Sequence, residues 1–460
     1  MIILKRISEA KLTEGKIATQ LIKLTLPMII GMLGMVIFNL TDTYFVGQLG
    51  ADQLAALSFT FPVVLIINSF TKGIGIGATS IISKYIGGKE HQKVKRTATD
   101  SLLLGLIITS IFVIIGLLTI KPLFSILGAE GLILDYIQEY MSIWYFGSFM
   151  IVIPMIGNNI IRSLGDTKVP GLIMGISAVV NIMLDPILIF GYGPFPALGI
   201  KGAAIATVFA RTITAITAIG VLHFRENIIS FSKLKFKQTF ESWKGILHIG
   251  IPNSLIQMAL PLSSAIITRL LASYGPNVVA GFGVATKIEF FAMSFIMALN
   301  SVMGPFIGQN LGSKLFGRVN KGLKFGEIFS LSTGIIIAII LSISADPIAR
   351  IFNSNPEVVK TVVLYILVVS FTYGFQGILK IDSTILNILN KPIHAASLIF
   401  IQTFLLYIPL AILGSKFIGI AGIFGALSIS YLLSGILAHV EVKKYITKYK
   451  SNVIEQNDVA

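Results

Sequence analysis

The sequence predicts an all-α polytopic membrane protein, with twelve transmembrane helices in two six-helix lobes related by a pseudo-two-fold axis. Of its 460 residues, 54% are hydrophobic and 12% are charged, about half the charged fraction of an ordinary soluble protein. Apolar runs close to the ~20 residues that cross a bilayer recur from one end of the chain to the other. Short basic loops separate these runs, and the second half of the chain repeats features of the first.

Twelve spans are expected from the apolar runs. Their bounds are roughly 20–46, 53–84, 94–120, 134–160, 168–192, 198–223, 242–273, 278–309, 320–345, 357–388, 393–413 and 418–440. Basic residues are dense at both ends of the chain and in the even-numbered loops, whereas the odd-numbered loops hold only Lys121, Lys201, Arg350 and Lys416. Cytoplasmic loops carry the excess of lysine and arginine. The pattern therefore predicts a multi-pass protein of the inner (plasma) membrane with both termini in the cytoplasm.

Composition and motifs exclude several classes of function. The net charge of +15 is carried mostly by loops between apolar runs, so it indicates topology and not a nucleic-acid surface. The absence of cysteine excludes disulfides, thiolate metal sites and cysteine nucleophiles. No glycine loop ends in Lys-Ser or Lys-Thr, so ATP hydrolysis is not expected, and no enzyme signature is found. The glycines Gly73, Gly75 and Gly77 lie in an apolar run and are expected to pack helices. Five histidines show no spacing typical of metal ligands: His91, His223, His248, His394 and His439.

The second half of the chain repeats parts of the first. A shift of 225 positions places Pro27 on Pro252 and Gly50 on Gly275, and it aligns KYIGGK (84–89) with QNLGSK (309–314). Two six-span halves in the same orientation are a common transporter plan. The predicted domains are an N-terminal lobe (1–223) with a cation site, a basic cytoplasmic linker (224–241) and a C-terminal lobe (242–460). The charged N-terminal segment leads into a run too long for a signal-peptide core, so no cleaved leader is expected.

A carboxylate interrupts the first apolar stretch, Leu24–Gly50. At ~1.5 Å per residue, Asp42 lies roughly 27 Å along this helix from Leu24. A charge inside the membrane costs at least ~2.5–3.5 kcal/mol on insertion scales, and by default it marks an ion or substrate pathway. The alternative interpretation is that Asp42 caps the helix end or pairs with a neighbouring helix.

The fifth span carries the sequence NIMLDP, in which Asn181 and Asp185 are four residues apart and share one helix face. Asp185 lies ~24 Å along its span, nearly the depth of Asp42, so the two carboxylates are expected at one level. Two adjacent carboxylates in a low dielectric do not both remain ionised without cost, which predicts that the pair binds a proton near neutral pH. The site is equally suited to sodium, a hard cation that prefers oxygen ligands. Alternatively, Pro186 only kinks the helix and neighbours satisfy Asp185.

Hydroxyl groups in two other spans are candidates for the same site. Tyr140 can donate a hydrogen bond to a carboxylate, although tyrosines are also typical of interfacial anchors. Thr207 can add a hydroxyl, although the small residues around it indicate helix packing. The expected sodium ligands are Asp42, Asn181, Asp185 and Thr207.

The second half does not mirror this pair of carboxylates. Its charges inside the predicted spans include Arg269, Lys287, Glu289, Lys380 and Asp382. The two members of each close pair, Lys287 with Glu289 and Lys380 with Asp382, point about 200° apart on a helix. Each is therefore expected to find a different partner, and internal ion pairs that hold the second lobe together are favoured over a substrate role.

Four short motifs are specific in combination: DTYFVG from Asp42 to Gly47, RSLGDT from Arg162, GAAIAT from Gly202 to Thr207, and QNLG from Gln309 to Gly312. They resemble motifs of the multidrug and toxic compound extrusion (MATE) transporters, and the resemblance extends over about residues 15 to 445. The chain is most similar to the DNA-damage-inducible-protein-F-like prokaryotic branch. The resemblance implies two six-helix bundles around a central cleft, with a cation site at Asp42, Tyr140, Asn181, Asp185 and Thr207.

The resemblance also implies an activity, namely export of cationic or amphipathic organic compounds driven by inward proton or sodium flow through alternating access. Protonation of the site is expected to bend the first helix at Pro27, which has no amide hydrogen; a static kink or a position in the first helical turn is the alternative. We expect a monomer in the lipid bilayer that takes small organic substrates, with no nucleic-acid partner and no cofactor other than the coupling ion.

Three other functions compete with this one. A lipid-linked oligosaccharide flippase of the same superfamily would need a cationic cavity, which Arg211, Arg269 and Lys287 leave open. A membrane enzyme that processes lipids would need a catalytic cluster, and the sequence shows none. A channel is disfavoured by the two-lobe repeat.

Overall fold

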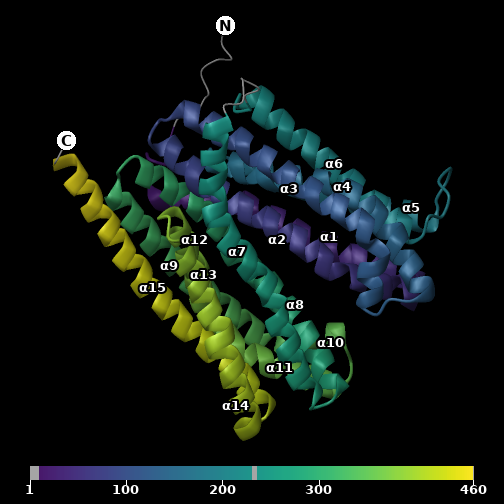
Figure 1. Cartoon of the computed structure of the whole chain (residues 1–460). Coiled ribbons are helices and arrows are strands. Elements are labelled where there is room, and N and C mark those ends of the chain that lie inside the picture. Colours follow the sequence, from purple (N-terminus) through teal and green to yellow (C-terminus); the bar gives the residue numbers. More distant parts are fainter. Residues whose placement is uncertain (1–9, 230–235, 459–460) are drawn as a thin grey trace. The chain divides into compact units, whose positions relative to one another are not determined.

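The computed structural model describes residues 10–229 and 236–458. In the first half the helices are α1 (Ile17–Leu49), α2 (Ala51–Gly87), α3 (His91–Ile126), α4 (Gly131–Ser163), α5 (Lys168–Phe190), α6 (Ile200–Gly220) and η1 (Val221–Arg225), followed by α7 (Phe236–Ala272). The second half contains α8 (Pro276–Gly312), α9 (Phe316–Ile343), α10 (Ala345–Phe352), α11 (Pro356–Val369), η2 (Ser370–Thr372), α12 (Tyr373–Ile388), α13 (Pro392–Phe400), η3 (Ile401–Tyr407), α14 (Ile408–Ile418) and α15 (Ile420–Asp458). The described residues contain no strand (Figure 1).

Twelve spans within the described residues are long and apolar enough to cross a membrane, which confirms the predicted number. Three of them are irregular. Ile200–Arg225 ends in the π-helical segment η1, Pro356–Ile388 contains the short turn η2, and Pro392–Ile418 contains the π-helical segment η3. Such interruptions are tolerated in membrane helices where neighbouring groups satisfy the freed backbone. The short amphipathic helix α10 lies outside the twelve spans.

The chain divides into two compact units. Unit 1 contains Leu26–Ser254, and unit 2 contains Leu12–Thr25 and the chain from Leu255 onward. Both divisions fall inside helices, because Leu26 lies in α1 and Leu255 lies in α7. The predicted linker (224–241) includes residues 230–235, which lie outside the described residues, so a division there stays a prediction.

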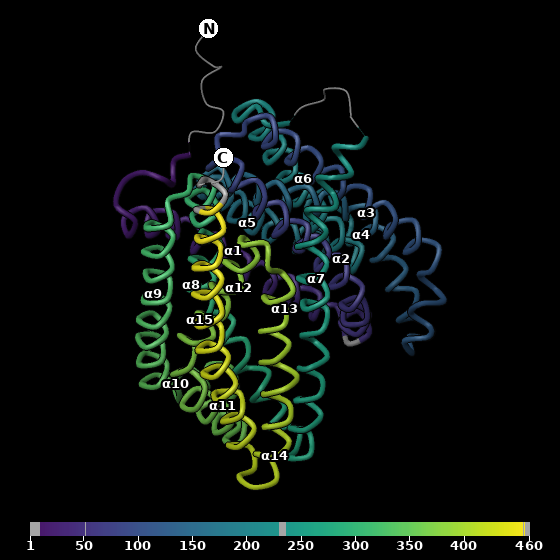
Figure 2. The backbone as a smooth tube through the Cα atoms, turned by 60° about the vertical axis from the view of Figure 1, so that its left-hand side comes forward, coloured from purple at the N-terminus to yellow at the C-terminus, as the bar shows by residue number. Residues whose placement is uncertain are grey.

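Each unit is organised around a central helix. In unit 1, α4 contacts α2, α3 and α6, and α6 also contacts α5. In unit 2, α12 contacts α8, α9 and α15, and Figure 2 shows α9 and α15 as long rods with similar tilt. The largest fully buried side chains include Tyr145 and Phe124 in unit 1 and Tyr365 and Phe424 in unit 2.

The backbone confirms the internal repeat. Lys89 and Lys314, which are 225 positions apart, both adopt a φ of 57° in the left-handed region that side chains rarely occupy. The amide of Lys89 donates to the carbonyl of Ile86, and the amide of Lys314 donates to that of Leu311, each at 3.0 Å. The same turn therefore ends the second span of each half.

The motif from Gln309 to Gly312 holds the segment before α1. The side-chain oxygen of Gln309 accepts from the amide of Leu12 at 3.1 Å, and Asn310 donates to the carbonyl of Leu12 at 3.1 Å. Arg318 donates to the carbonyl of Gly15 at 2.8 Å. The start of α1 is therefore bound to unit 2, whereas the rest of α1 belongs to unit 1.

The glycines of α2 pack helices, as the sequence predicted. A methyl group at Gly73 would lie 2.5 Å from the carbonyl oxygen of Gly250, and one at Gly77 would lie 2.4 Å from that of Ile246. Both partners belong to α7. Only glycine allows backbones to approach this closely, so these residues serve contact between helices and not nucleotide binding.

Close contact between α1 and α5 also depends on glycine. A methyl group at Gly171 would lie 2.4 Å from the carbonyl oxygen of Pro27, and one at Gly31 would lie 2.9 Å from the Cα of Gly171. One contact further along, a methyl group at Gly34 would lie 3.5 Å from the Cα of Gly175. Successive contacts thus advance in the same direction along both helices, which shows that α1 and α5 pack in parallel.

Replacing Gly171 with alanine is expected to reduce the free energy of unfolding by about 1–3 kcal/mol, the usual cost of overpacking. Gly175→Ala on the same helix is the matched control, because a methyl group there has no neighbour within 4 Å. Alanine also has the higher helix propensity, by up to ~1 kcal/mol, so Gly175→Ala should be neutral or stabilising. Thermal unfolding in detergent measures both, and equal midpoints would contradict the close contact.

Candidate functional site

Asn181 and Asp185 form the buried base of a polar site on α5. Both side chains are 0% exposed, and the Nδ2 of Asn181 donates a hydrogen bond to the Oδ1 of Asp185 at 3.0 Å. The spacing of four residues places them one above the other on the same helix face. Pro186 follows directly, and α5 continues through it to Phe190.

The parallel packing of α1 and α5 brings Asp42 to the same level. Gly31 of α1 lies against Gly171 of α5, and the two residue numbers differ by 140. Because the helices are parallel, other residues of α1 lie beside residues of α5 whose numbers are higher by about the same amount. Asp42 is therefore opposite the turn that ends in Asp185. The two carboxylates are close enough to interact electrostatically, and Asp42 is half-buried.

Arg211 on α6 completes the charged part of the site. It interacts electrostatically with Asp42, and its guanidinium lies 4.8 Å from the ring centroid of Phe38 and 3.7 Å from the sulfur of Met35. Both neighbours belong to α1, so Arg211 packs along the helix that carries Asp42. From the sequence, Arg211 was expected only as part of a flippase cavity. Its charge inside the sixth predicted span was the signal available, because such charges mark functional sites by default.

With both carboxylates ionised, the site has one negative charge in excess, and some of its oxygen atoms have no hydrogen-bond partner among the described residues. When ionised, Asp42 and Asp185 together carry two negative charges, against one positive charge on Arg211. Three buried oxygens accept no hydrogen bond from any described residue: Oδ1 of Asp42, Oδ1 of Asn181 and Oδ2 of Asp185. Buried acceptors without donors are costly. One proton or one monovalent cation would both neutralise the charge and supply a partner.

The two predicted hydroxyl residues occupy different positions. Tyr140 on α4 is 5% exposed and interacts electrostatically with both Asp42 and Asp185. Thr207 on α6 is 8% exposed and lies one turn before Arg211, so it shares the face that carries the guanidinium. No hydrogen bond joins either hydroxyl to the carboxylates within the described part of the chain. The structure thus brings Tyr140 to the two carboxylates more clearly than Thr207.

Unit 2 contains a second polar cluster, around Glu289 on α8. Its carboxylate accepts hydrogen bonds from the hydroxyls of Tyr365 and Tyr431, the latter at 2.8 Å. Glu289 also interacts electrostatically with Lys380. Internal ion pairs were expected for these charges from the sequence, and the tyrosines were not. The available signal was position, because Tyr431 lies near the middle of its predicted span and not at an interface.

A third cluster joins Glu327, Asp382 and His439, which come from α9, α12 and α15. The Nδ1 of His439 lies 2.5 Å from the Oε1 of Glu327. The sequence shows no ligand spacing among the five histidines, and the structure places one of them, His439, beside two acidic side chains. Spacing along the chain is uninformative here, because the three residues come from three separate helices.

The family model MatE matches residues 27–187 and 252–413. Over 444 residues, the chain is 36% identical to a protein of Shewanella oneidensis named FAD transporter, covering 96% of this chain and 98% of the relative. It is 25% identical to the multidrug export protein MepA of Staphylococcus haemolyticus, covering 96% of this chain and 97% of that protein.

Solved structures agree with the family model. The Vibrio cholerae MATE transporter VcmN is 30% identical, and the match covers 94% of this chain and 97% of VcmN. The TM-score is 0.89 for an aspartate-to-asparagine variant of VcmN and 0.88 for VcmN in the bent form. Together with the twelve apolar spans, these matches show a multi-pass membrane transporter and not an enzyme. The chain therefore belongs to the MatE family, the multidrug and toxic compound extrusion transporters.

Proposed function

We propose that this transporter exports cationic or amphipathic organic compounds as a multidrug antiporter that works by alternating access, driven by inward flow of protons or sodium. In this proposal Asp42 and Asp185 bind the coupling ion. The excess negative charge and the three oxygens without partners support the proposal most directly. The similarity to multidrug export proteins supports the substrate class.

The coupling ion is a proton or sodium. A proton would bridge acceptors that now lack a donor, whereas sodium would take the oxygens of Asp42, Asn181 and Asp185, with Thr207 as a further ligand. Either ion would neutralise the single excess negative charge of the site. Oxygen ligands suit a hard cation, so the ligand chemistry favours neither ion over the other.

Transport in proteoliposomes with independently imposed proton and sodium gradients tests the function and identifies the ion. We expect substrate accumulation against its gradient when one ion gradient is imposed and not when both are collapsed. Equal fluxes under all gradients would show that the substrate moves without coupling. An ionophore specific for the other ion is the control, because it should leave accumulation unchanged.

Export of a flavin dinucleotide is a second candidate. The relative named FAD transporter is more similar to this chain than the multidrug relative, at 36% against 25% identity. Arg211 would attract the phosphates of such a substrate. Flux of FAD and of a cationic dye, measured in the same vesicles, distinguishes the two candidates, and a lipid-linked oligosaccharide serves as the third substrate for the flippase alternative.

We propose further that α1 bends at Pro27 when the ion binds. Pro27 is the eleventh residue of α1, which begins at Ile17, so it does not lie in the first helical turn. Its ring removes one hydrogen bond of the helix and weakens the turn. The division between the two units also falls at this point, between Thr25 and Leu26. A neutral Asp42 loses much of its need for polar partners, which would free the helix to move.

Spin labels test this hinge in a chain that has no native cysteine. Ile37→Cys on α1 and Ile111→Cys on α3 are suitable sites, because both residues are 52% exposed. The distance between the labels is expected to differ between pH 5 and pH 8, and Pro27→Ala is expected to reduce the difference. Pro62→Ala inside α2 is the matched control. Identical distances at both pH values, with and without sodium, would exclude the hinge.

We also propose that the protein is a monomer in the inner membrane with both termini in the cytoplasm. The dense basic residues at both ends of the chain support this orientation. Labelling of single cysteines introduced near each end, in intact cells with an impermeant reagent, tests it, because cytoplasmic sites should remain unlabelled.

A further inference from the structure

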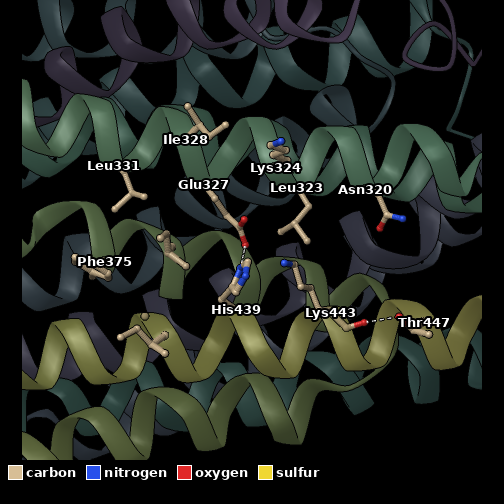
Figure 3. A pocket seen from close by; sticks show the side chains of 13 residues that line it. Asn320, Leu323, Lys324, Glu327, Ile328, Leu331, Phe375, His439, Lys443 and Thr447 are labelled. Atoms are coloured by element: carbon tan, nitrogen blue, oxygen red, sulfur yellow. Dashed lines mark hydrogen bonds and ion pairs between the residues drawn. The ribbon is translucent and has the colours of Figure 1, made fainter.

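Two acidic side chains and a histidine meet inside unit 2, whereas Asp42 belongs to unit 1. Glu327, Asp382 and His439 each offer one ligand atom, and these atoms all lie within 4.8 Å of one another. Figure 3 shows Glu327 on α9 and His439 on α15 pointing toward each other. Three different helices therefore direct nitrogen and oxygen donors at one point.

Asp382 is fully buried and has no hydrogen-bond partner among the described residues. Its side chain is 0% exposed, and neither carboxylate oxygen has a hydrogen bond from any residue that the structure describes. Lys443 is close enough to interact electrostatically with Asp382, but it forms no ion pair with this carboxylate within 4.0 Å in the described chain. A buried carboxylate without hydrogen bonds or a close ion pair destabilises the folded protein. A bound cation would remove this destabilisation.

A cavity of about 710 Å³ borders the cluster. Glu327 and His439 line it, together with the polar or charged residues Asn320, Lys324, Lys443 and Thr447 (Figure 3). Asp382 is not among the residues that line the cavity. The cavity gives an ion a route to the cluster and leaves room for water beside it.

We infer that Glu327, Asp382 and His439 bind a divalent transition-metal ion, with zinc as the best match to their donor atoms. One imidazole nitrogen and two carboxylate oxygens are typical zinc ligands, and sites with three protein ligands keep a fourth position for water. The cavity supplies that position. Two carboxylates also neutralise one divalent ion, so the buried cluster would carry no net charge.

The geometry needs a small adjustment. Bonds of ~2.1 Å in a tetrahedral site separate the ligand atoms by about 3.4 Å. The atoms now lie within 4.8 Å of one another, and the Nδ1 of His439 is only 2.5 Å from the Oε1 of Glu327. Metal binding therefore requires that this pair separate by about an ångström and that the longer separations close by up to about 1.4 Å. Rotation of the flexible Glu327 and of His439 supplies both changes, since His439 is 35% exposed on the cavity side.

Metal binding to the purified full-length protein tests the inference. After removal of metal with a chelator, titration calorimetry is expected to show one zinc ion bound per chain, and cobalt(II) is expected to give the visible absorption of a tetrahedral site. His439→Gln and Asp382→Asn should each weaken zinc binding at least about tenfold, because even residues that only orient a metal ligand contribute that much. His394→Gln is the matched control, since His394 instead contacts the hydroxyl of Tyr445 at 2.8 Å.

Lys443→Met is expected to change zinc affinity in the opposite direction to His439→Gln and Asp382→Asn. Its ammonium group competes with a metal ion for Asp382, so its removal is expected to tighten zinc binding several-fold. Absence of zinc binding in the unmodified protein would overturn the inference, as would equal weakening by His394→Gln and His439→Gln. Weaker zinc binding in Lys443→Met would also overturn it, because Lys443 would then be a structural partner of Asp382. His439→Gln keeps the test informative if Asp382→Asn fails to fold, because His439 is partly exposed.

Discussion

Asp42→Asn is expected to abolish uphill export and to leave downhill movement of substrate intact. Asparagine keeps the size of the side chain but takes up no proton and carries no charge, so the excess negative charge of the site disappears. A gradient of two pH units corresponds to ~2.7 kcal/mol, which supports up to ~100-fold accumulation if one proton is exchanged for one neutral substrate. The variant should accumulate no substrate above equilibrium, as measured in proteoliposomes with an imposed gradient.

Asp135→Asn is the matched control for this change. Asp135 lies on α4 of the same unit and is exposed, so its loss should leave accumulation unchanged. Export by Asp42→Asn at the unmodified rate against a gradient would show that Asp42 does not couple transport. A similar loss in Asp135→Asn would indicate damage to folding or insertion, which size-exclusion chromatography of both variants checks.

Asp42 and Asp185 are expected to behave as one unit in a double-mutant cycle. The two carboxylates interact electrostatically, and one excess charge belongs to the pair and not to either residue alone. Changes at residues that share a site are strongly non-additive. Asp42→Asn combined with Asp185→Asn should therefore reduce coupled transport little more than the worse single change.

As a control, the double-mutant cycle needs a second pair of residues that do not interact with each other. Asp42→Asn combined with Asp135→Asn provides it, and its effects on coupled transport should add. Additive losses for Asp42 and Asp185 would separate the two carboxylates and leave each with its own role. Initial rates under one fixed ion gradient, normalised to the amount of folded protein in the vesicles, are the quantity to compare.

The fold could be predicted closely from the sequence because its signals are local. Hydropathy over about twenty residues identifies a span, and the structure has all twelve within its described residues. The internal repeat between the two halves of the chain could be recognised in the sequence for the same reason. Gly50 and Gly275 were matched in sequence, and each has a positive φ, of 139° and 112°, just before its helix begins.

The Asp42 site was predictable in part. Asn181 and Asp185 share a helix face because of their spacing alone, and their hydrogen bond follows from it. The roles of Asp42, Tyr140 and Thr207 were inferred from a carboxylate inside an apolar run and from nearby hydroxyl groups, were supported by the resemblance to the family, and stay predictions. The neighbouring charge of Arg211 was not foreseen, because its position depends on how α6 turns its face toward α1.

Sequence alone therefore determined the elements, their order, the repeat and the pair of residues on α5, since each depends on neighbours within a few turns of one helix. Tertiary structure decided which distant residues meet. Glu289 and Tyr431 are 142 positions apart, and Glu327 and His439 are 112 apart. Nothing in the local pattern specifies the rotation of a membrane helix about its own axis when most of its surface is apolar. Packing between small residues and satisfaction of buried polar groups select that rotation, and they act only after the helices have come together.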